Sequence, residues 1–223
     1  MTEFETLQDV LHARHSCRAF LPDALPRATV EKIVTAAGRA PSWCNAQPWQ
    51  VIVTAGAETE RLRNGLMDEV QTASHSPDIP FPARYSGPYQ DRRRTCGWQL
   101  YDAVGVTKGD RDASRAQMME NFRFFGAPHI ALITSDQELG QYGLVDCGGF
   151  ITAFTLAAQA LGIATIPQAA VASYTPYLRR FFDLPEDRVI VCSIAFGLSD
   201  TQHPANSFRT GRAPLGEVLC WRE

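Results

Sequence analysis

The sequence lacks the basic surplus of a protein that binds polyanions. Its 21 lysines and arginines are outnumbered by 24 acidic residues, which gives a formal net charge of −3. Nucleic-acid binders and binders of anionic membrane surfaces normally carry a positive patch large enough to show in this balance. We therefore expect neither a nucleic acid nor a membrane as partner, and the charge balance favours small-molecule chemistry.

Long apolar runs and export signals are also missing. No run approaches the ~20 apolar residues that cross a bilayer. The start of the chain contains Glu3 and Glu5 and no basic stretch of the kind that precedes a signal peptide. We expect a cytoplasmic protein that is neither exported nor inserted into a membrane.

Motifs for metals, disulfides and several common enzyme classes are absent as well. Six cysteines and five histidines show no paired spacing, so we expect reduced thiols and no metal. Cys17 and Cys44 remain open, because they fall inside motifs. There is no Gly-x-Ser-x-Gly elbow, no Walker A loop and no Gly-x-Gly-x-x-Gly after a strand, which leaves hydrolases, nucleotidases and Rossmann enzymes unsupported.

What is present suits one globular domain spanning residues 1–223. Hydrophobic residues make up 45% of the chain and charged residues 20%, with no linker or repeat. Periodicity predicts helices near residues 4–11, 30–37, 62–70, 115–125, 146–161 and 177–182, and strands near 49–54, 129–134, 163–166 and 189–196. The last strand has no polar alternation, which is typical of a strand covered on both faces. We expect an α+β fold with helices on two sides of a sheet.

Two segments carry more specific expectations. Residues 74–112 begin with many Pro, Ser, Gly and charged residues, which predicts an irregular insertion or a lid. The stripe of Met118, Met119 and Phe122 is most simply interpreted as core.

Polar residues gather at three places, residues 14–18, 41–47 and 206–212. Arginine presents a planar fork that binds phosphate oxygens in pairs, and Ser or Asn supplies neutral hydrogen bonds to a sugar-like chain or a ring edge. Together the three segments indicate a phosphorylated, heterocyclic ligand.

Two of these segments carry a family resemblance. Arg14-His15-Ser16-Cys17-Arg18-Ala19-Phe20 resembles the Arg-x-Ser-x-Arg-x-Phe opening of FMN-dependent nitroreductases, and residues 40–49 are similar to their Ala-Pro-Ser-x-x-Asn-x-Gln-Pro-Trp signature. The likeness continues through residues 162–163, 167–170, 195–197 and 209–218. Residues 92–94, 97–101 and 121–125 look closest to a nitrobenzoate-reductase-like branch.

The resemblance implies a nitroreductase-like mixed β-sheet flanked by helices. It also implies an intertwined homodimer with exchanged C-terminal segments, and an FMN in each of two pockets at the dimer interface. Each site then has walls from both subunits.

The resemblance also implies roles for individual residues. Arg14 with Arg209 or Arg212 neutralises the FMN phosphate, and Ser16 bonds the cofactor nearby. Arg18 approaches the pyrimidine edge, where a cation stabilises the anionic reduced flavin. The cofactor-binding set is Arg14, His15, Ser16, Arg18, Pro41, Ser42, Trp43, Asn45, Gln47, Pro167, Gln168, Ala169, Ala170, Arg209 and Arg212.

Parts of this set come from the partner or act through the backbone. Pro41, Ser42 and Asn45 belong to the site of the partner chain, and residues 167–170 pass their backbone along the flavin so that an amide faces N5. Ala169 stands where certain relatives carry glutamate, and Trp43 occupies a position that is often small in the family. Substrate preference therefore does not transfer from them.

The expected activity is FMN-dependent reduction of nitroaromatic or similar small, electron-poor acceptors, with NADH or NADPH as hydride donor in a ping-pong sequence and no catalytic side chain. One alternative keeps the fold but changes the reaction to dehalogenation, alkene reduction or flavin fragmentation. Others are a non-catalytic flavin-binding protein and a cysteine enzyme built on Cys44, which lacks a matching histidine motif. The basic run 92–94 is either a solvated surface or a clamp for an aromatic carboxylate.

Overall fold

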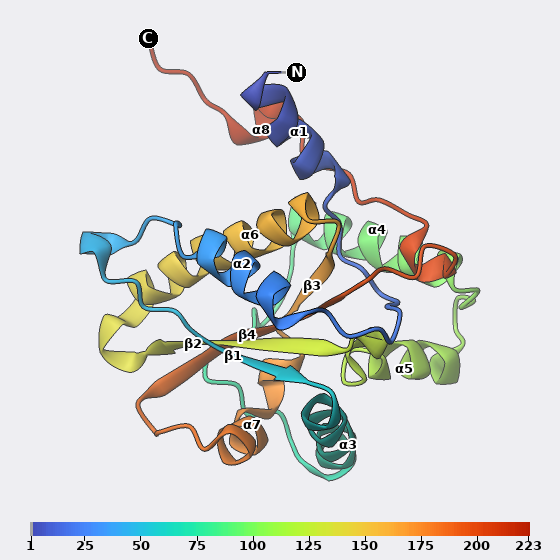
Figure 1. Ribbon diagram of the computed structural model, residues 1–223. Coiled ribbons are helices and arrows are strands. Elements are labelled where there is room, and N and C mark those ends of the chain that lie inside the picture. The colour runs from blue at the N-terminus through green and yellow to red at the C-terminus, as the bar shows by residue number, and fades with distance from the viewer. Residues whose placement is uncertain (1) are drawn as a thin grey trace.

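A four-stranded sheet lies at the centre of the protein, which the computed structural model describes over residues 2–223. Its order is β1-β2-β4-β3, and helices cover both faces (Figure 1). The strands are β1 (Gln50–Ala55), β2 (His129–Asp136), β3 (Ala164–Gln168) and β4 (Arg188–Gly197). The α+β class and the two-sided cover are as the sequence predicts.

The helices fall into two groups around this sheet. α2 (Arg27–Ala37) and α6 (Gly140–Ala160) cover one face, and α3 (Ala57–Thr72) and α7 (Thr175–Phe182) cover the other. The remaining helices are α1 (Glu3–Ala13), α4 (Gly87–Ala103), α5 (Arg111–Met119) and α8 (Leu215–Val218). The middle strands β2 and β4 are apolar because each contributes to both cores.

The direction of the strands differs from the mixed sheet that the resemblance implies. Every adjacent pair is antiparallel. The α6 crossover makes β2 and β3 run the same way, but β4 inserts between them, so no neighbouring pair is parallel. Among the described residues, the one parallel pairing is an isolated bridge between Ser16 and Thr165.

The expected irregular insertion over residues 74–112 is mostly helical. α4 begins at Gly87 with Pro88 in its first turn, where the missing proline N–H costs no hydrogen bond, and it runs to Ala103. Irregular chain is limited to residues 73–86 and 104–110. The Ser, Pro and Gly residues that suggested a loop mark the start of a helix instead.

The expected core stripe at the end of α5 and just beyond it is only partly buried. Phe122 is 3% exposed, but Met118 is 45% exposed. The helix ends at Met119, and Phe124 and Phe125 then take positive φ angles of 58° and 54°. This turn directs the phenylalanine rings into the core and leaves Met118 outside it.

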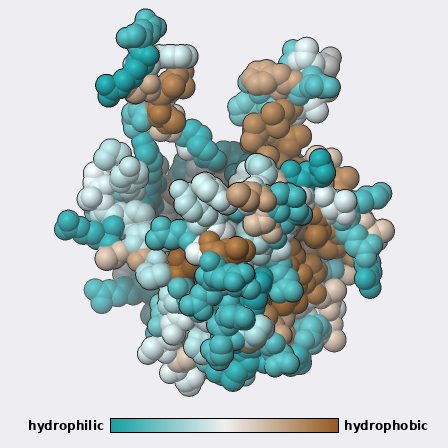
Figure 2. Space-filling model, turned by 90° about the vertical axis from the view of Figure 1, so that its left-hand side faces the viewer, coloured by the Kyte–Doolittle hydropathy of each residue, from teal (hydrophilic) through white to brown (hydrophobic). Residues whose placement is uncertain are grey.

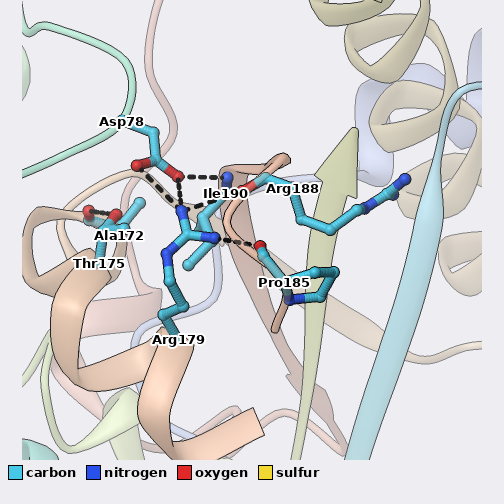
Figure 3. A network of polar contacts seen from close by, with 7 residues as sticks. All are labelled: Asp78, Ala172, Thr175, Arg179, Pro185, Arg188 and Ile190. Atoms are coloured by element: carbon cyan, nitrogen blue, oxygen red, sulfur yellow. Dashed lines mark hydrogen bonds and ion pairs between the residues drawn. The ribbon is translucent and has the colours of Figure 1, made fainter. Parts of the chain in front are cut away.

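The irregular segment 73–86 is pinned to the body by an ion pair. Figure 3 shows Asp78 between the Arg179 guanidinium, at 3.1 Å, and the backbone N–H of Ile190, at 2.8 Å. Arg179 also donates to the carbonyls of Pro185 and Arg188. This network ties the segment to α7 and β4.

One segment corrects the expectation about apolar length. Residues Gln137–Ala160, which include α6, are long and apolar enough to cross a membrane by length and composition. In the fold this helix packs against α2, β2 and β3, and Cys147, Phe150 and Phe154 are buried in the core. Its other side is open, with Tyr142 and Val145 exposed, so about a third of its most apolar stretch is buried inside the fold.

Both ends of the chain project from the same side of the body. α1 and the C-terminal segment rise above it in Figure 1, and the turned view of Figure 2 separates them into two arms with apolar residues on each. The large apolar side chains exposed on the arms are Phe4, Leu7, Leu11, Leu215, Val218, Leu219 and Trp221.

Candidate functional site

Four arginines from opposite ends of the sequence line one cavity. It has a volume of about 300 Å³ and lies where the end of α1 meets the segment after Asn206. Its charged lining residues are Arg14, Arg18, Arg209 and Arg212, and His15 and Ser16 lie between them. The sequence-predicted cationic residues are therefore brought together, with both Arg209 and Arg212 at the cavity.

The N-terminal part of this lining is held against the sheet by backbone hydrogen bonds. Cys17 N–H donates to the carbonyl of Thr165 at 3.0 Å, and Leu21 N–H donates to that of Leu198 at 2.9 Å. The Cys17 thiol is fully buried and donates to the Ala19 carbonyl, so it is a core group rather than a reactive one. Four of the five residues 14–18 line the cavity, and Cys17 alone turns into the core.

The cations of this cavity have no carboxylate to neutralise them. Within residues 2–223 all eight ion pairs involve other residues. Burial lowers the pKa of Arg14, and the charge of Arg212 lowers it further. Burial likewise lowers the pKa of Arg18. Partly desolvated like charges without counterions are costly, and an anion such as phosphate relieves that cost.

His15 adds a neutral acceptor to the same wall. Its Nδ1 lies 3.1 Å from the carbonyl of Ala13, which assigns the proton to Nδ1 and a lone pair to Nε2. Nε2 is buried without a hydrogen-bond partner. Burial lowers the pKa of His15, as do the nearby charges of Arg209, Arg14 and Arg18, and only the bond to Ala13 opposes this. The imidazole is thus suited to accept a hydrogen bond from a ligand hydroxyl.

A second cavity of about 320 Å³ continues from the first through Ser16 and Arg18, which line both. Residues 167–170 form one wall, and the small side chains of Ala169 and Ala170 leave room for a flat ring. The other lining residues are Leu100, Tyr101, Gln117, Met118, Asn121, Phe125 and Ile166.

Gln168 carries an unfulfilled hydrogen-bonding group at this second cavity. The residue is 3% exposed, and its Nε2 donates to the backbone carbonyl of Asn121 at 2.8 Å. Its Oε1 is buried and has no partner. An anion-binding cavity next to a second cavity with an unpaired amide oxygen fits the phosphorylated heterocycle that the sequence indicates.

The loop of residues 41–47 lies away from both cavities in its own chain. Trp43 is 61% exposed; its backbone N–H donates to Oδ2 of Asp146 at 3.0 Å, and its ring centre lies 4.7 Å from that of Tyr142. The Ser42 hydroxyl accepts from Gln47 N–H at 3.0 Å. That this loop serves the partner's site therefore stays a prediction.

Backbone strain marks this loop as a preformed structure. Cys44, Asn45 and Gln47 have φ angles of 48°, 59° and 49°, a region that non-glycine residues rarely adopt. Such strain is retained mainly at ligand clamps and switch regions. Cys44 is exposed here and lines neither cavity.

The basic run 92–94 also lies outside both cavities. Arg92 forms an ion pair with Glu217, and the Arg93 guanidinium lies 5.3 Å from the centre of the Tyr85 ring. These contacts favour a surface role over a substrate clamp.

Sequence reasoning missed several lining residues. Cys96, Leu100 and Tyr101 come from α4, Gln117 comes from α5, and Phe208 precedes Arg209. On a helix, such residues carry no signal that separates a cavity-facing position from a solvent-facing one. Tyr101 and Asn121 lie within the segments 97–101 and 121–125, whose resemblance to nitrobenzoate reductases is the sequence signal that could have placed them at the site.

Comparison with known proteins agrees with this geometry. The Nitroreductase family description matches residues 11–198. Nitroreductase NfnB of Mycolicibacterium smegmatis is 33% identical over 96% of this chain and 92% of its own length. A 4-nitrobenzoate reductase of Nocardioides sp. is 32% identical over 95% of this chain and 87% of its own.

Solved nitroreductase structures have the same fold as this chain. The FMN-dependent nitroreductase NfnB from Mycobacterium smegmatis, solved in complex with NADPH, superimposes with a TM-score of 0.94 at 31% identity over 99% of this chain and 100% of that one. The FMN- and NADPH-dependent nitroreductase NfnB from sphigopyxis sp. strain HMH also reaches 0.94, at 28% identity over 97% of this chain and 99% of that one. The chain belongs to the nitroreductase family.

Proposed function

We propose that this protein binds FMN and uses NADH or NADPH to reduce nitroaromatic or similarly electron-poor small molecules. The observation that carries the proposal is a cluster of four arginines that no carboxylate pairs with among residues 2–223, next to a second cavity of about 320 Å³ that shares Ser16 and Arg18 with it. The printed names of the relatives, which include an FMN-dependent nitroreductase and a 4-nitrobenzoate reductase, support the same chemistry.

Each group around the cavities has a role in holding FMN. Arg14, Arg209 and Arg212 bind the phosphate, since guanidinium forks match its oxygens in charge and shape. The Nε2 of His15 accepts from a hydroxyl of the ribityl chain, and Ser16 bonds the same region. Arg18 reaches the pyrimidine edge, and residues 167–170 lie along the ring.

Bound FMN supplies hydride acceptance and donation at its N5. The residues of the chain contribute position, exclusion of water and fixed charge rather than acid–base catalysis. Arg18 is the only charged residue of the second cavity, and its partial burial strengthens its field there. A cation in this place stabilises the negative charge of the reduced ring.

The second cavity also shapes the choice of acceptor. Aside from Arg18, its lining among the described residues consists of apolar groups, Ser16, the Tyr101 ring and the neutral amides of Gln117, Gln168 and Asn121, with no carboxylate. This lining favours flat aromatic acceptors that are neutral or anionic. Donor and acceptor use the same space in turn, which gives ping-pong kinetics.

We further propose a homodimer in which the C-terminal segments are exchanged and the loop 41–47 completes the partner's site. Residues 209–223 are exposed apart from a half-buried Ala213, so this segment gains little from its own chain. Its exposed residues Leu215, Val218 and Trp221, at 71%, 76% and 78%, are too apolar for a solvated tail.

The proposal is tested by steady-state kinetics of the purified protein with NADH and NADPH against a panel of nitroaromatics, quinones, enones and halogenated aromatics. We expect a yellow protein that oxidises reduced nicotinamide fastest with nitroaromatics, with parallel double-reciprocal lines. A faster reaction with enones or halogenated compounds would assign another reductive flavin reaction. If the protein retains flavin but turns over no acceptor, it is a non-catalytic flavin-binding protein.

A further inference from the structure

Asn206 lies at the junction between the two arginine-bearing segments. It ends the short helix Pro204–Asn206 and is 7% exposed. Its Oδ1 accepts from the backbone N–H of Arg18 at 2.7 Å, and its Nδ2 donates to the carbonyls of Ala19, at 2.9 Å, and Asp200, at 2.8 Å. One side chain therefore binds the N-terminal segment on both sides of the Arg18–Ala19 peptide.

The main chain of the same residue holds the C-terminal arginine. The carbonyl of Asn206 accepts from Nη1 of Arg209 at 2.8 Å. Phe208, two residues further on, lies under Arg18, with 5.6 Å between its ring centre and the Arg18 guanidinium carbon. The segment from Asn206 to Phe208 therefore contacts both Arg18 and Arg209 and orients them.

The chemistry of these contacts requires an amide at this position. The side chain has to accept from one backbone group and donate to two others, and among small side chains asparagine alone has the shape for all three. Aspartate keeps the acceptor but sets a carboxylate oxygen against two carbonyls. Alanine leaves the Arg18 N–H without its partner inside the protein, and the carbonyls of Ala19 and Asp200 keep only their bonds from other donors.

We propose that Asn206 is a positioning residue that holds Arg18 and Arg209 in register for the phosphate and the ring of the ligand. This inference rests on the proposed function, because the ligand it concerns is FMN. Asn206 lines neither cavity, so it acts through the arginines and not by contact with the ligand.

The test compares FMN with riboflavin, which lacks the phosphate. Flavin fluorescence titrations of the full-length, flavin-free protein give both dissociation constants for wild type, Asn206→Ala and Asn206→Asp. Asn64→Ala, on the exposed surface of α3, is the matched control. We expect the ratio of the riboflavin to the FMN dissociation constant to fall by about tenfold or more in both variants, as loss of one buried polar contact implies. The control should keep the wild-type ratio.

The outcomes separate the inference from the proposed function. Equal weakening of both flavins would show that Asn206 does not hold Arg209 for the phosphate, and unchanged dissociation constants would mean no role, so either result overturns the inference. Wild type that binds FMN no better than riboflavin would overturn the phosphate assignment itself. Asn206→Asp preserves side-chain size and the bond to Arg18, so it carries the test if the alanine variant does not fold.

Discussion

His15 shows how a single residue reports on the charge around it. Its pKa is lowered by burial first and by Arg209, Arg14 and Arg18 next. The unfolded chain regains an ordinary histidine pKa, so it binds more protons than the native state as pH falls through ~6.5. Protonation therefore favours unfolding, and stability present at neutral pH is lost on acidification.

We predict that replacing His15 by glutamine flattens this dependence. Between about pH 7.5 and 5.5 the free energy of unfolding of the flavin-free protein should fall less steeply in His15→Gln than in wild type. Some slope remains, because burial also lowers the pKa of His129. Urea denaturation at a series of pH values measures the slopes, and identical slopes would contradict a neutral His15 in the native protein.

The phosphate-binding residues could be predicted from the sequence, but the residues that hold them in position could not. Arg14, Ser16 and Arg18 fall in a recognisable order, and all three line the cavity. Asn206 stood in a segment already noted as polar, yet nothing in the sequence says that its amide faces Arg18, 188 positions away. A buried polar residue and an exposed one look alike until tertiary contacts decide which it is.

At the scale of elements, the Asp78 network fixes a long irregular segment to the sheet. The side chains of Arg179 and Asp78 are 15% and 22% exposed, so the pair is shielded more than a surface salt bridge. Asp78 also satisfies the N–H of Ile190 at the start of β4 (Figure 3). Its removal leaves the partly buried Arg179 cation without a carboxylate and the Ile190 N–H without its partner.

We predict that Asp78→Ala lowers the free energy of unfolding by about 2–3 kcal/mol. Asp78→Asn keeps an acceptor for the Ile190 N–H and should lose less. Glu31→Ala, which breaks an exposed pair with Arg27, is the control and should change stability little. Equilibrium urea unfolding gives the values, and an Asp78→Ala variant as stable as the control would show that the segment is not held by this pair.

Element identities were more predictable than their geometry. Val189 to Phe196 reads as a strand buried on both faces, and it forms most of β4. The direction of neighbouring strands was not predictable, because it depends on where β4 inserts between β2 and β3. α4 was hidden because Ser86, Gly87 and Pro88 resemble a loop, although the same residues begin a helix.

At the scale of the whole molecule, the two apolar arms bear on assembly. α1 and the C-terminal segment expose large apolar side chains on the same side of the body (Figures 1 and 2). Exposed apolar surface of this kind marks an interface, and the homodimer implied by the resemblance gives it a partner. The dimer remains a prediction.

We predict that deleting residues 215–223 weakens self-association. The full chain should sediment as a dimer at micromolar concentration, and the truncated chain should show a dimer dissociation constant raised by about tenfold or more, since four large apolar side chains leave the interface. Sedimentation equilibrium measures both. A monomeric full chain, or an unchanged constant after truncation, would refute the exchanged-segment arrangement.

The central claim is that arginines from both ends of the chain act on one phosphate. A double-mutant cycle tests it most directly, with FMN titrated into wild type, Arg14→Ala, Arg209→Ala and the double variant. We predict about tenfold or greater loss in each single variant, and a loss in the double variant that differs from the product of the two because they share one partner. Wild-type affinity in both single variants, or strictly multiplicative losses that riboflavin shows equally, would contradict the claim.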